Sequence, residues 1–260
     1  MAGSDFLIRH LRRLRELIGL SQDAWAAKIH YSAQHVGGIE RGERPVTPDY
    51  LAAVDQALGT SFVEYYEGHI RNEVTPIWLK SWFEHEREAD LLRHFETVIV
   101  PGLLQTEAYA RAIIGTELAG AAAEEAVMNR LARQAVITRN DSPARLVVTL
   151  DEGVLYRPVG GPTVMRPQLL ALVEAIQRPN VSIYVVPSHV GAYAGLNGPL
   201  ALASVQGRTV GLVDGHPEGG VVENPVGVTA LERRWEAVRE YAEPQHRSLE
   251  LITKAAESWT

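Results

Sequence analysis

The sequence lacks cysteine entirely, and its 260 residues carry a net charge of −7. The absence of cysteine excludes disulfide bonds and thiolate metal sites, and it suits a reducing compartment. No segment approaches the ~20 consecutive apolar residues that a membrane-spanning helix requires. Residues 1–17 also lack the apolar run that forms the core of a signal peptide. We therefore expect a cytoplasmic protein that does not enter membranes.

Sequence patterns for metal or cofactor chemistry are also lacking. There is no HExxH pair, and His189 and His216 stand alone in segments rich in glycine and proline. The segment Gly160-Gly161-Pro162 has neither the lysine of a phosphate-binding loop nor the glycine spacing of a dinucleotide-binding turn. We therefore expect no metal site and no cofactor, and we interpret residues 160–162 as a turn.

One pair of acids raises the question of an enzyme. Asp151 and Glu152 follow an apolar run that predicts a strand, and catalytic carboxylates often occur at such a place. Adjacent residues on a strand point in opposite directions, however, which makes them a poor acid–base pair. We expect no catalytic site here, and we expect Glu152 to contact Arg130 or Arg133.

The residues that are present give the composition of an ordinary globular protein, with 46% hydrophobic and 22% charged residues. The length is sufficient for two domains. Residues 1–45 hold seven basic and five acidic side chains, so the acidic excess lies in the rest of the chain. Because a net acidic chain binds nucleic acid only through a local basic surface, the N-terminal segment is where such a surface can form.

Helical spacing and helix-end signals predict an all-α N-terminal domain over residues 1–72. Ser21, Ser32 and Thr47 stand where helix N-caps are expected, and Gly19 and Gly59 stand where helices end. We expect five helices, over about residues 6–18, 22–29, 33–40, 48–58 and 61–71.

The rest of the chain predicts a connecting helix and a second domain. Residues 75–95 have the pattern of an amphipathic helix, within a connecting segment of residues 73–97. Further along, helical patterns alternate with valine-rich runs bounded by glycine, proline and asparagine. We expect an extended run and a helix within residues 96–114, helices over 122–138, 165–177, 227–241 and 244–258, and strands over 145–152, 180–187, 198–205 and 209–215. This order predicts an α+β domain over residues 98–260, with helices packed on a mixed sheet.

The stretch LSQDAWAAKIHYSAQHVGGIERGER (20–44) contains the spacing of a helix-turn-helix. Small Ala26 stands where the two helices cross, and IERG ends the second helix. Three apolar residues occupy the interhelix core positions: Ile29, Val36 and Ile39. In these features the stretch resembles the Xre family, the type of helix-turn-helix found in phage Cro and repressor proteins. The family usually has a left-handed glycine at the tight turn, where this chain has His30, and histidine is among the few other residues enriched in that conformation.

This resemblance implies which residues contact DNA. The first residues of the helix over 33–40 enter the major groove, so that Ser32, Ala33, Gln34 and Gly37 face the base pairs. Gln34 is the best reader of sequence, because its amide can pair with the edge of an adenine. The residues expected at phosphates are Gln22, His35, Arg41 and Arg44.

Alternatives stay open for several of these residues. Gln22 either holds a phosphate or braces the reading side chains, and His35 and Arg44 have the alternative of being ordinary exposed polar residues. Gly37 and Gly38 either permit a close approach to DNA or belong to a short helix held by tertiary packing. A structural role is expected for Glu40, which we predict to pair with an arginine of the first helix such as Arg15.

Beyond residue 75 the chain contains six ordered segments with distinctive sequences: VPGLLQTEAYARA, RLARQ, TLDEGVLYRPVGG, QLLAL, RPNVSIYVVP and GLNGPLALAS. In these segments it resembles the C-terminal domain of WhiJ-like regulators, also described as antitoxin-like. The resemblance covers most of residues 75–258, and it implies a small partner protein encoded by a neighbouring gene.

Two segments of this part are candidates for binding surfaces. Residues 100–112 are either a turn and a core helix, with Leu103, Leu104, Tyr109 and Ile113 buried, or part of a ligand or partner surface. The glycine-rich loop over residues 190–199 is a candidate rim of a binding site.

These expectations combine into a sequence-specific DNA-binding transcriptional regulator, a repressor that acts as a homodimer on double-stranded DNA. The C-terminal domain is expected to bind a small partner protein or ligand and thereby to change the affinity for DNA. Two alternatives remain. One is the antitoxin of a two-protein system, and the other is a DNA-binding enzyme whose C-terminal domain acts on a nucleotide-like small molecule.

Overall fold

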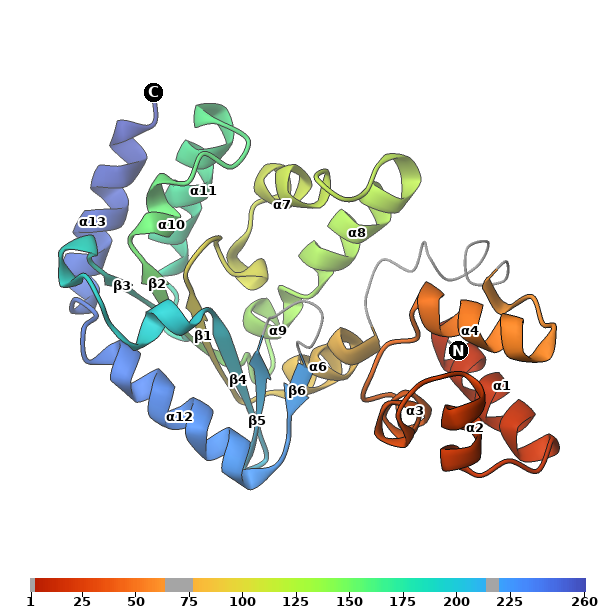
Figure 1. The fold of residues 1–260 in the computed structure, drawn as a ribbon. Coiled ribbons are helices and arrows are strands. Elements are labelled where there is room, and N and C mark those ends of the chain that lie inside the picture. The colour runs from red at the N-terminus through yellow and green to blue at the C-terminus, as the bar shows by residue number, and fades with distance from the viewer. Residues whose placement is uncertain (1–2, 64–76, 214–219) are drawn as a thin grey trace. The chain divides into compact units, whose positions relative to one another are not determined.

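The computed structural model describes residues 3–63, 77–213 and 220–260, which Figure 1 shows as a ribbon. The chain divides into two compact units, Met1–Trp82 and Phe83–Thr260. The N-terminal unit is helical, and the C-terminal unit contains a six-stranded sheet with helices packed on it. The expected combination of an all-α domain with an α+β domain is therefore confirmed.

The N-terminal unit begins with four helices: α1 (Gly3–Leu17), α2 (Gln22–Lys28), α3 (Ala33–Glu40) and α4 (Pro48–Leu58). The side chains of Ser21, Ser32 and Thr47 each accept a hydrogen bond from the backbone of the following turn, so all three are N-caps as predicted. Gly59 ends α4 in the left-handed conformation. The fifth helix expected over residues 61–71 lies mostly outside the described residues.

One apolar core joins these helices. The three interhelix residues of the sequence pattern, Ile29, Val36 and Ile39, are buried together with Trp25 of α2 and Leu51 of α4. Burying a large apolar side chain contributes roughly 1.5–3 kcal/mol. The orientation of α3 on α2 is therefore set by this core.

The C-terminal unit is built on one mixed sheet in the order β3-β2-β1-β4-β5-β6. Its strands are β1 (Leu91–Glu96), β2 (Arg145–Asp151), β3 (Val181–Val186), β4 (Leu200–Val205), β5 (Arg208–Val213) and β6 (Gly220–Val222). Strands β1, β2 and β3 are parallel to one another, and β4, β5 and β6 continue the sheet with antiparallel pairing. The carboxyl ends of β1, β2, β3 and β5 therefore lie on the same side of the sheet.

Helices cover this sheet. The α-helices are α6 (Ile77–Glu88, which begins in the N-terminal unit), α7 (Glu107–Ile114), α8 (Gly120–Ala132), α9 (Ala135–Thr138), α10 (Gly153–Tyr156), α11 (Pro162–Ala175), α12 (Pro225–Arg239) and α13 (Gln245–Ser258). Among the described residues there are also short 3₁₀ turns: η1 (Gly102–Leu104) lies between β1 and α7, and η2 (Ser188–Val190) and η3 (Ala194–Asn197) lie between β3 and β4. Helix α12 packs along one face, where Trp235 joins Phe95 and Leu202 in a core. Helix α13 covers the free edge of β3, because Ser248 Oγ accepts a hydrogen bond from Val185 N.

Several predicted elements need correction. The helix expected over residues 75–95 ends at Glu88, and Leu91–Glu96 form β1 in the middle of the sheet. The helix expected over 122–138 is divided into α8 and α9. The helix expected over 165–177 begins earlier, at Pro162, after two glycines with positive φ that form the predicted turn. Strand β6 had no counterpart among the expected elements. None of the described helices has the length and apolar character needed to cross a bilayer.

Candidate nucleic-acid interface

A tight turn connects α2 to α3. His30 has a φ of 59°, so the left-handed conformation predicted for this histidine is confirmed. Tyr31 N donates to the carbonyl of Ala26 at 2.9 Å, and the side chain of Ala26 is buried at the crossing of the two helices. The local geometry is that of a helix-turn-helix.

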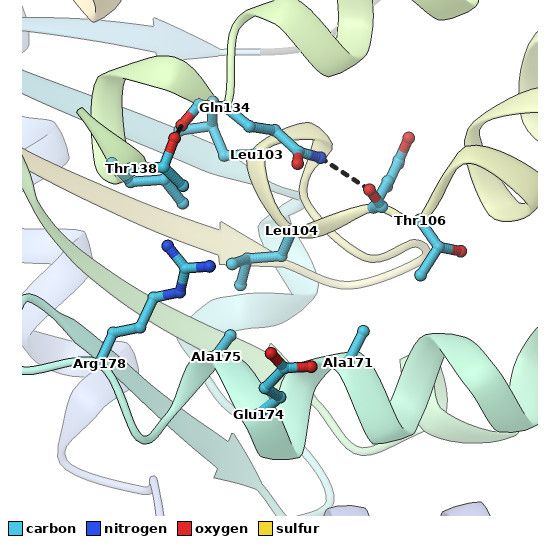
Figure 2. Close-up of a pocket in the computed structure, with 11 residues that line it drawn as sticks. Leu103, Leu104, Thr106, Gln134, Thr138, Ala171, Glu174, Ala175 and Arg178 are labelled. Carbon is cyan, nitrogen blue, oxygen red and sulfur yellow. Dashed lines mark hydrogen bonds between the residues drawn. The ribbon is translucent and has the colours of Figure 1, made fainter. Parts of the chain in front are cut away.

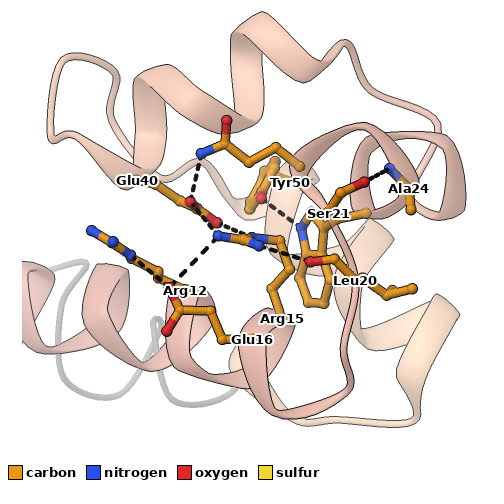
Figure 3. A network of polar contacts seen from close by, with 10 residues as sticks. Arg12, Arg15, Glu16, Leu20, Ser21, Ala24, Glu40 and Tyr50 are labelled. Atoms are coloured by element: carbon orange, nitrogen blue, oxygen red, sulfur yellow. Dashed lines mark hydrogen bonds and ion pairs between the residues drawn. The ribbon is translucent and has the colours of Figure 1, made fainter.

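A polar network ties the end of α3 to α1 and α2 (Figure 3). Arg15 Nε donates to Glu40 Oε1 at 2.5 Å, and Arg15 Nη2 donates to Glu40 Oε2 at 2.9 Å. The remaining Arg15 donor, Nη1, reaches the carbonyl of Leu20 at 2.8 Å. Gln22 Nε2 donates to the same carboxylate at 2.8 Å. The predicted Arg15–Glu40 pair is confirmed, and Gln22 braces α3 through Glu40.

The charges in this network stabilise one another. Burial disfavours the charged form of Glu40, but hydrogen bonds from Arg15 and Gln22 outweigh that effect and lower the pKa of the carboxyl below its usual value. The hydrogen bond from Arg15 to Glu40 in turn raises the pKa of the guanidinium. Both groups are therefore ionised, and α3 is held at its C-terminal end by a bidentate ion pair.

The first turn of α3 is left open on its outer side. Gln34 is exposed, and so is Ser32, whose Oγ accepts a hydrogen bond from His35 N at 3.1 Å. Ala33 is half-buried against the core. Ser32 therefore has a structural role as the cap of α3, and Gln34 presents a free amide beside it.

Gly37 differs from expectation. It is buried, because the side chains of Arg41 and Gln22 cover it. A Cβ added at this position would lie 2.9 Å from Arg41 Nη1 and 3.3 Å from Gln22 Oε1. Gly37 thus lies beneath these two side chains and offers no open surface toward a groove. Arg41 is exposed, and its guanidinium makes two 2.7 Å hydrogen bonds to the carboxylate of Glu43. Any phosphate contact of Arg41 must compete with this ion pair.

His35 and Arg44 contact each other. Arg44 Nη1 lies 3.3 Å from His35 Nδ1. The imidazole is half-buried between two tyrosine rings, with ring centroids 5.0 Å from Tyr31 and 6.1 Å from Tyr50. Tyr50 is fixed in turn by a 3.0 Å hydrogen bond from Trp25 Nε1. The alternative that His35 and Arg44 are ordinary exposed polar residues is therefore wrong.

The aromatic surroundings of His35 were not expected from the sequence. Tyr31 immediately precedes Ser32, the N-cap of α3, and a side chain at that position often packs against the first turn of the helix that follows. This position next to the predicted N-cap was the available signal for the contact. Tyr50 comes from α4, and only the packing of the helices brings it to the imidazole.

The C-terminal unit contains a pocket of about 200 Å³. Its wall is formed by η1 and the following residues, by α9 with the adjoining Gln134, and by the C-terminal end of α11 (Figure 2). Leu104 and Ile137 supply apolar surface, whereas Glu174 in the last turn of α11 and Arg178 just after the helix supply opposite charges. Leu103, Leu104 and Tyr109 are buried as expected, but the buried isoleucine of this segment is Ile114, because Ile113 is only half-buried. The segment over 100–112 thus contributes both to the core and to the wall of a pocket.

The acids at the end of β2 take separate partners. Asp151 Oδ2 accepts a 2.7 Å hydrogen bond from the hydroxyl of Tyr193, whereas Glu152 Oε2 accepts hydrogen bonds from both N and Oγ of Ser188. The expected contact of Glu152 with Arg130 or Arg133 is wrong. Those two arginines donate to Gln105 and Glu86 instead.

A second pocket, of about 490 Å³, lies beside Glu152 and Ser188 and continues along α13. None of residues 190–199 lines this pocket or the first one, and the loop stays a candidate rim of a binding site elsewhere. Gly195 of the loop packs so closely on Tyr193 and Phe95 that an added Cβ would lie within 2.5 Å of each ring. Among the described residues, no group of three or more His, Asp or Glu side chains is placed to hold a metal ion.

Comparison with known proteins gives two matches along the chain. A family model described as a domain of unknown function (DUF5753) matches residues 79–254. A model described as a helix-turn-helix domain matches residues 7–64, which include the turn at His30 and the network around Glu40. No curated protein and no solved structure matches the chain.

Proposed function

The chain belongs to the DUF5753 family and carries a helix-turn-helix domain ahead of that family's domain, and we propose that it is a sequence-specific DNA-binding transcriptional repressor. The proposal includes the finer resemblance to the Xre type of helix-turn-helix and to WhiJ-like regulators. In it, α3 enters the major groove of double-stranded DNA in the cytoplasm, and the C-terminal unit controls when it does so.

One observation supports this proposal most. The inner side of α3 is fixed by buried Val36 and Ile39 and by the ion pair of Glu40, whereas Gln34 on the outer side is exposed. A rigid helix with a free amide in its first turn is the arrangement that reads base edges in the major groove. Arg41 and Arg44 flank the same helix and supply positive charge for phosphates.

Replacing Gln34 with alanine should relax the base preference at one position of the binding site. We expect a loss of roughly 1–3 kcal/mol for the preferred base and little change on random DNA, because only a base contact is removed. Selection from a random duplex library, followed by affinity measurements at fixed salt, tests this. The matched control is Gln56→Ala, which removes an exposed glutamine from α4. An unchanged sequence preference in Gln34→Ala would remove the reading role from this residue.

We further propose that two copies of the chain bind an inverted repeat, with their recognition helices about one DNA turn (~34 Å) apart. This separation sets the spacing of the half-sites. Analytical ultracentrifugation with duplexes of varied half-site spacing tests it, and a 1:1 stoichiometry on every duplex would contradict it.

We propose that a small protein encoded by a neighbouring gene, or a small ligand, acts on the C-terminal unit. The pocket between η1, α9 and α11 supports the idea of a ligand, since it combines apolar surface with an acid and a base. A protein purified from its own host should carry a small companion, and removing the companion should change DNA affinity roughly 5- to 150-fold. If DNA affinity is the same with and without the companion, this control does not exist.

The antitoxin and enzyme alternatives predict different results. An antitoxin would neutralise a harmful companion, so that expressing the companion alone should arrest growth whether or not DNA is bound. An enzyme would convert a nucleotide-like compound in the absence of any companion. The second pocket, beside Glu152 and Ser188, is the place to probe for such activity.

A further inference from the structure

The two glycines of α3 lie beneath arginine side chains. A Cβ added to Gly38 would lie 2.9 Å from Cδ and 3.1 Å from Cγ of Arg44. These are atoms in the middle of the arginine side chain, so they cannot move without displacing the whole side chain. At Gly37 the nearest atom is Nη1 at the far end of Arg41, which can move easily. Glycine weakens a helix interior, but at position 38 the missing Cβ leaves room for the Arg44 side chain to pack against α3.

Packed in this way, the Arg44 side chain runs back to the first turn of α3. Its Nη1 lies 3.3 Å from Nδ1 of His35, the residue next to Gln34. Arginine can only donate, so His35 Nδ1 must be the acceptor and the imidazole must be neutral. Burial lowers the pKa of His35, and the charge of Arg44 lowers it further, which favours this neutral form. The rings of Tyr31 and Tyr50 hold the imidazole in place.

A cation at this position has no intrinsic benefit for the helix. The first turn of a helix carries a partial positive charge, so a guanidinium there is mildly repelled. Among the described residues no carboxylate is paired with Arg44. The position does suit an anion that approaches the start of α3 from outside, as a DNA phosphate would.

We propose that Gly38 and His35 are positioning residues for Arg44, and that together they hold its guanidinium against the His35 imidazole in the first turn of α3, where it contacts a DNA phosphate. The inference rests on the proposed function. Because the side chain is already ordered, little of its conformational freedom is lost when DNA binds. His35 and Gly38 themselves need touch no DNA.

The test measures affinity of the full chain for a random-sequence duplex and for a library-selected duplex, over a range of salt concentrations. Arg44→Ala should weaken both roughly tenfold and reduce the slope of log affinity against log salt by about 1, because one phosphate contact is lost. Gly38→Ala should stabilise α3 in thermal unfolding and yet weaken binding roughly threefold, because its Cβ displaces Arg44. His35→Leu should weaken binding similarly, and His35→Asn, whose amide oxygen is an acceptor, should restore it.

Double variants decide between positioning and direct contact. Gly38→Ala and His35→Leu should have no further effect in an Arg44→Ala background, because both act through Arg44. Full effects in that background, or an unchanged salt slope in Arg44→Ala, would overturn the proposal. A reduced slope combined with no preference for the selected duplex would keep the positioning role and reject sequence-specific regulation. If instead Arg44→Ala leaves the salt slope unchanged while the parent protein prefers the selected duplex, the positioning role is rejected and sequence-specific regulation is kept.

Discussion

Glu40→Ala should destabilise the N-terminal unit by roughly 3–5 kcal/mol and abolish DNA binding, because it removes the bidentate partner of the buried Arg15 guanidinium and leaves only the longer, 3.9 Å contact with the half-exposed Glu16. The side chains of Arg15 and Glu40 are only 11% and 6% exposed, so water cannot replace the lost carboxylate. Gln22 would also lose its acceptor. Hydrogen exchange of peptides from α2 and α3, measured across a urea series, reports this loss for the N-terminal unit specifically.

Two further variants separate charge from packing. Glu40→Gln keeps the size of the side chain but not its charge, and we expect a smaller loss. Replacing both Arg15 and Glu40 with methionine should restore much of the stability, because no charge is then left buried. If Glu40→Ala costs less than about 1 kcal/mol, the pair behaves as a surface ion pair and does not support α3.

The Arg15–Glu40 pair should also make the stability of the N-terminal unit depend on pH in the acidic range. The folded-state pKa of Glu40 is lowered, so its contribution to stability is complete above the unfolded-state value and is lost as pH falls through the folded-state value. Protection of α3 should therefore decrease in this acidic range in the parent protein. Glu40→Gln should lack this part of the decrease.

A second large effect is expected at His94. This residue lies on β1, between β2 and β4, and is 6% exposed. Burial lowers the pKa of His94 to about 4, with the charge of Arg133 acting in the same direction and that of Glu86 opposing it. The unfolded chain takes up a proton near pH 6.5, whereas the folded chain resists it, so stability is highest above that pH and falls as pH decreases toward 4.

The expected loss from His94 is about 3 kcal/mol in total, of which roughly 2 kcal/mol falls between pH 6.5 and 5, before carboxyl groups titrate. Urea unfolding followed by hydrogen exchange in β1 and β2 measures it. His94→Gln should make stability nearly independent of pH in this interval. His189→Gln, at an exposed histidine of the same unit, should retain the slope of the parent. A slope that persists in His94→Gln would assign it to other groups.

Much of the N-terminal unit could be predicted because its signals are local. Ser21, Ser32 and Thr47 cap helices through bonds to residues three positions ahead, so the sequence alone contains both partners. The left-handed turn at His30 and the Arg15–Glu40 pair follow from known helix-turn-helix spacing. The candidate reader Gln34 was found in the same way and is exposed in the structure.

The sequence by itself therefore determined the helices of the N-terminal unit, the mixed sheet and the surface that faces DNA in our proposal. Only tertiary structure decided that LLRHFE is a central strand, since its hydrogen bonds go to β2 and β4, far away in the chain. Tertiary structure also decided that Gly37 is buried and that Arg44 contacts His35, because both depend on how arginine side chains pack on the surface of α3. Local interactions can be inferred from neighbouring residues, whereas packing between distant segments depends on the whole fold.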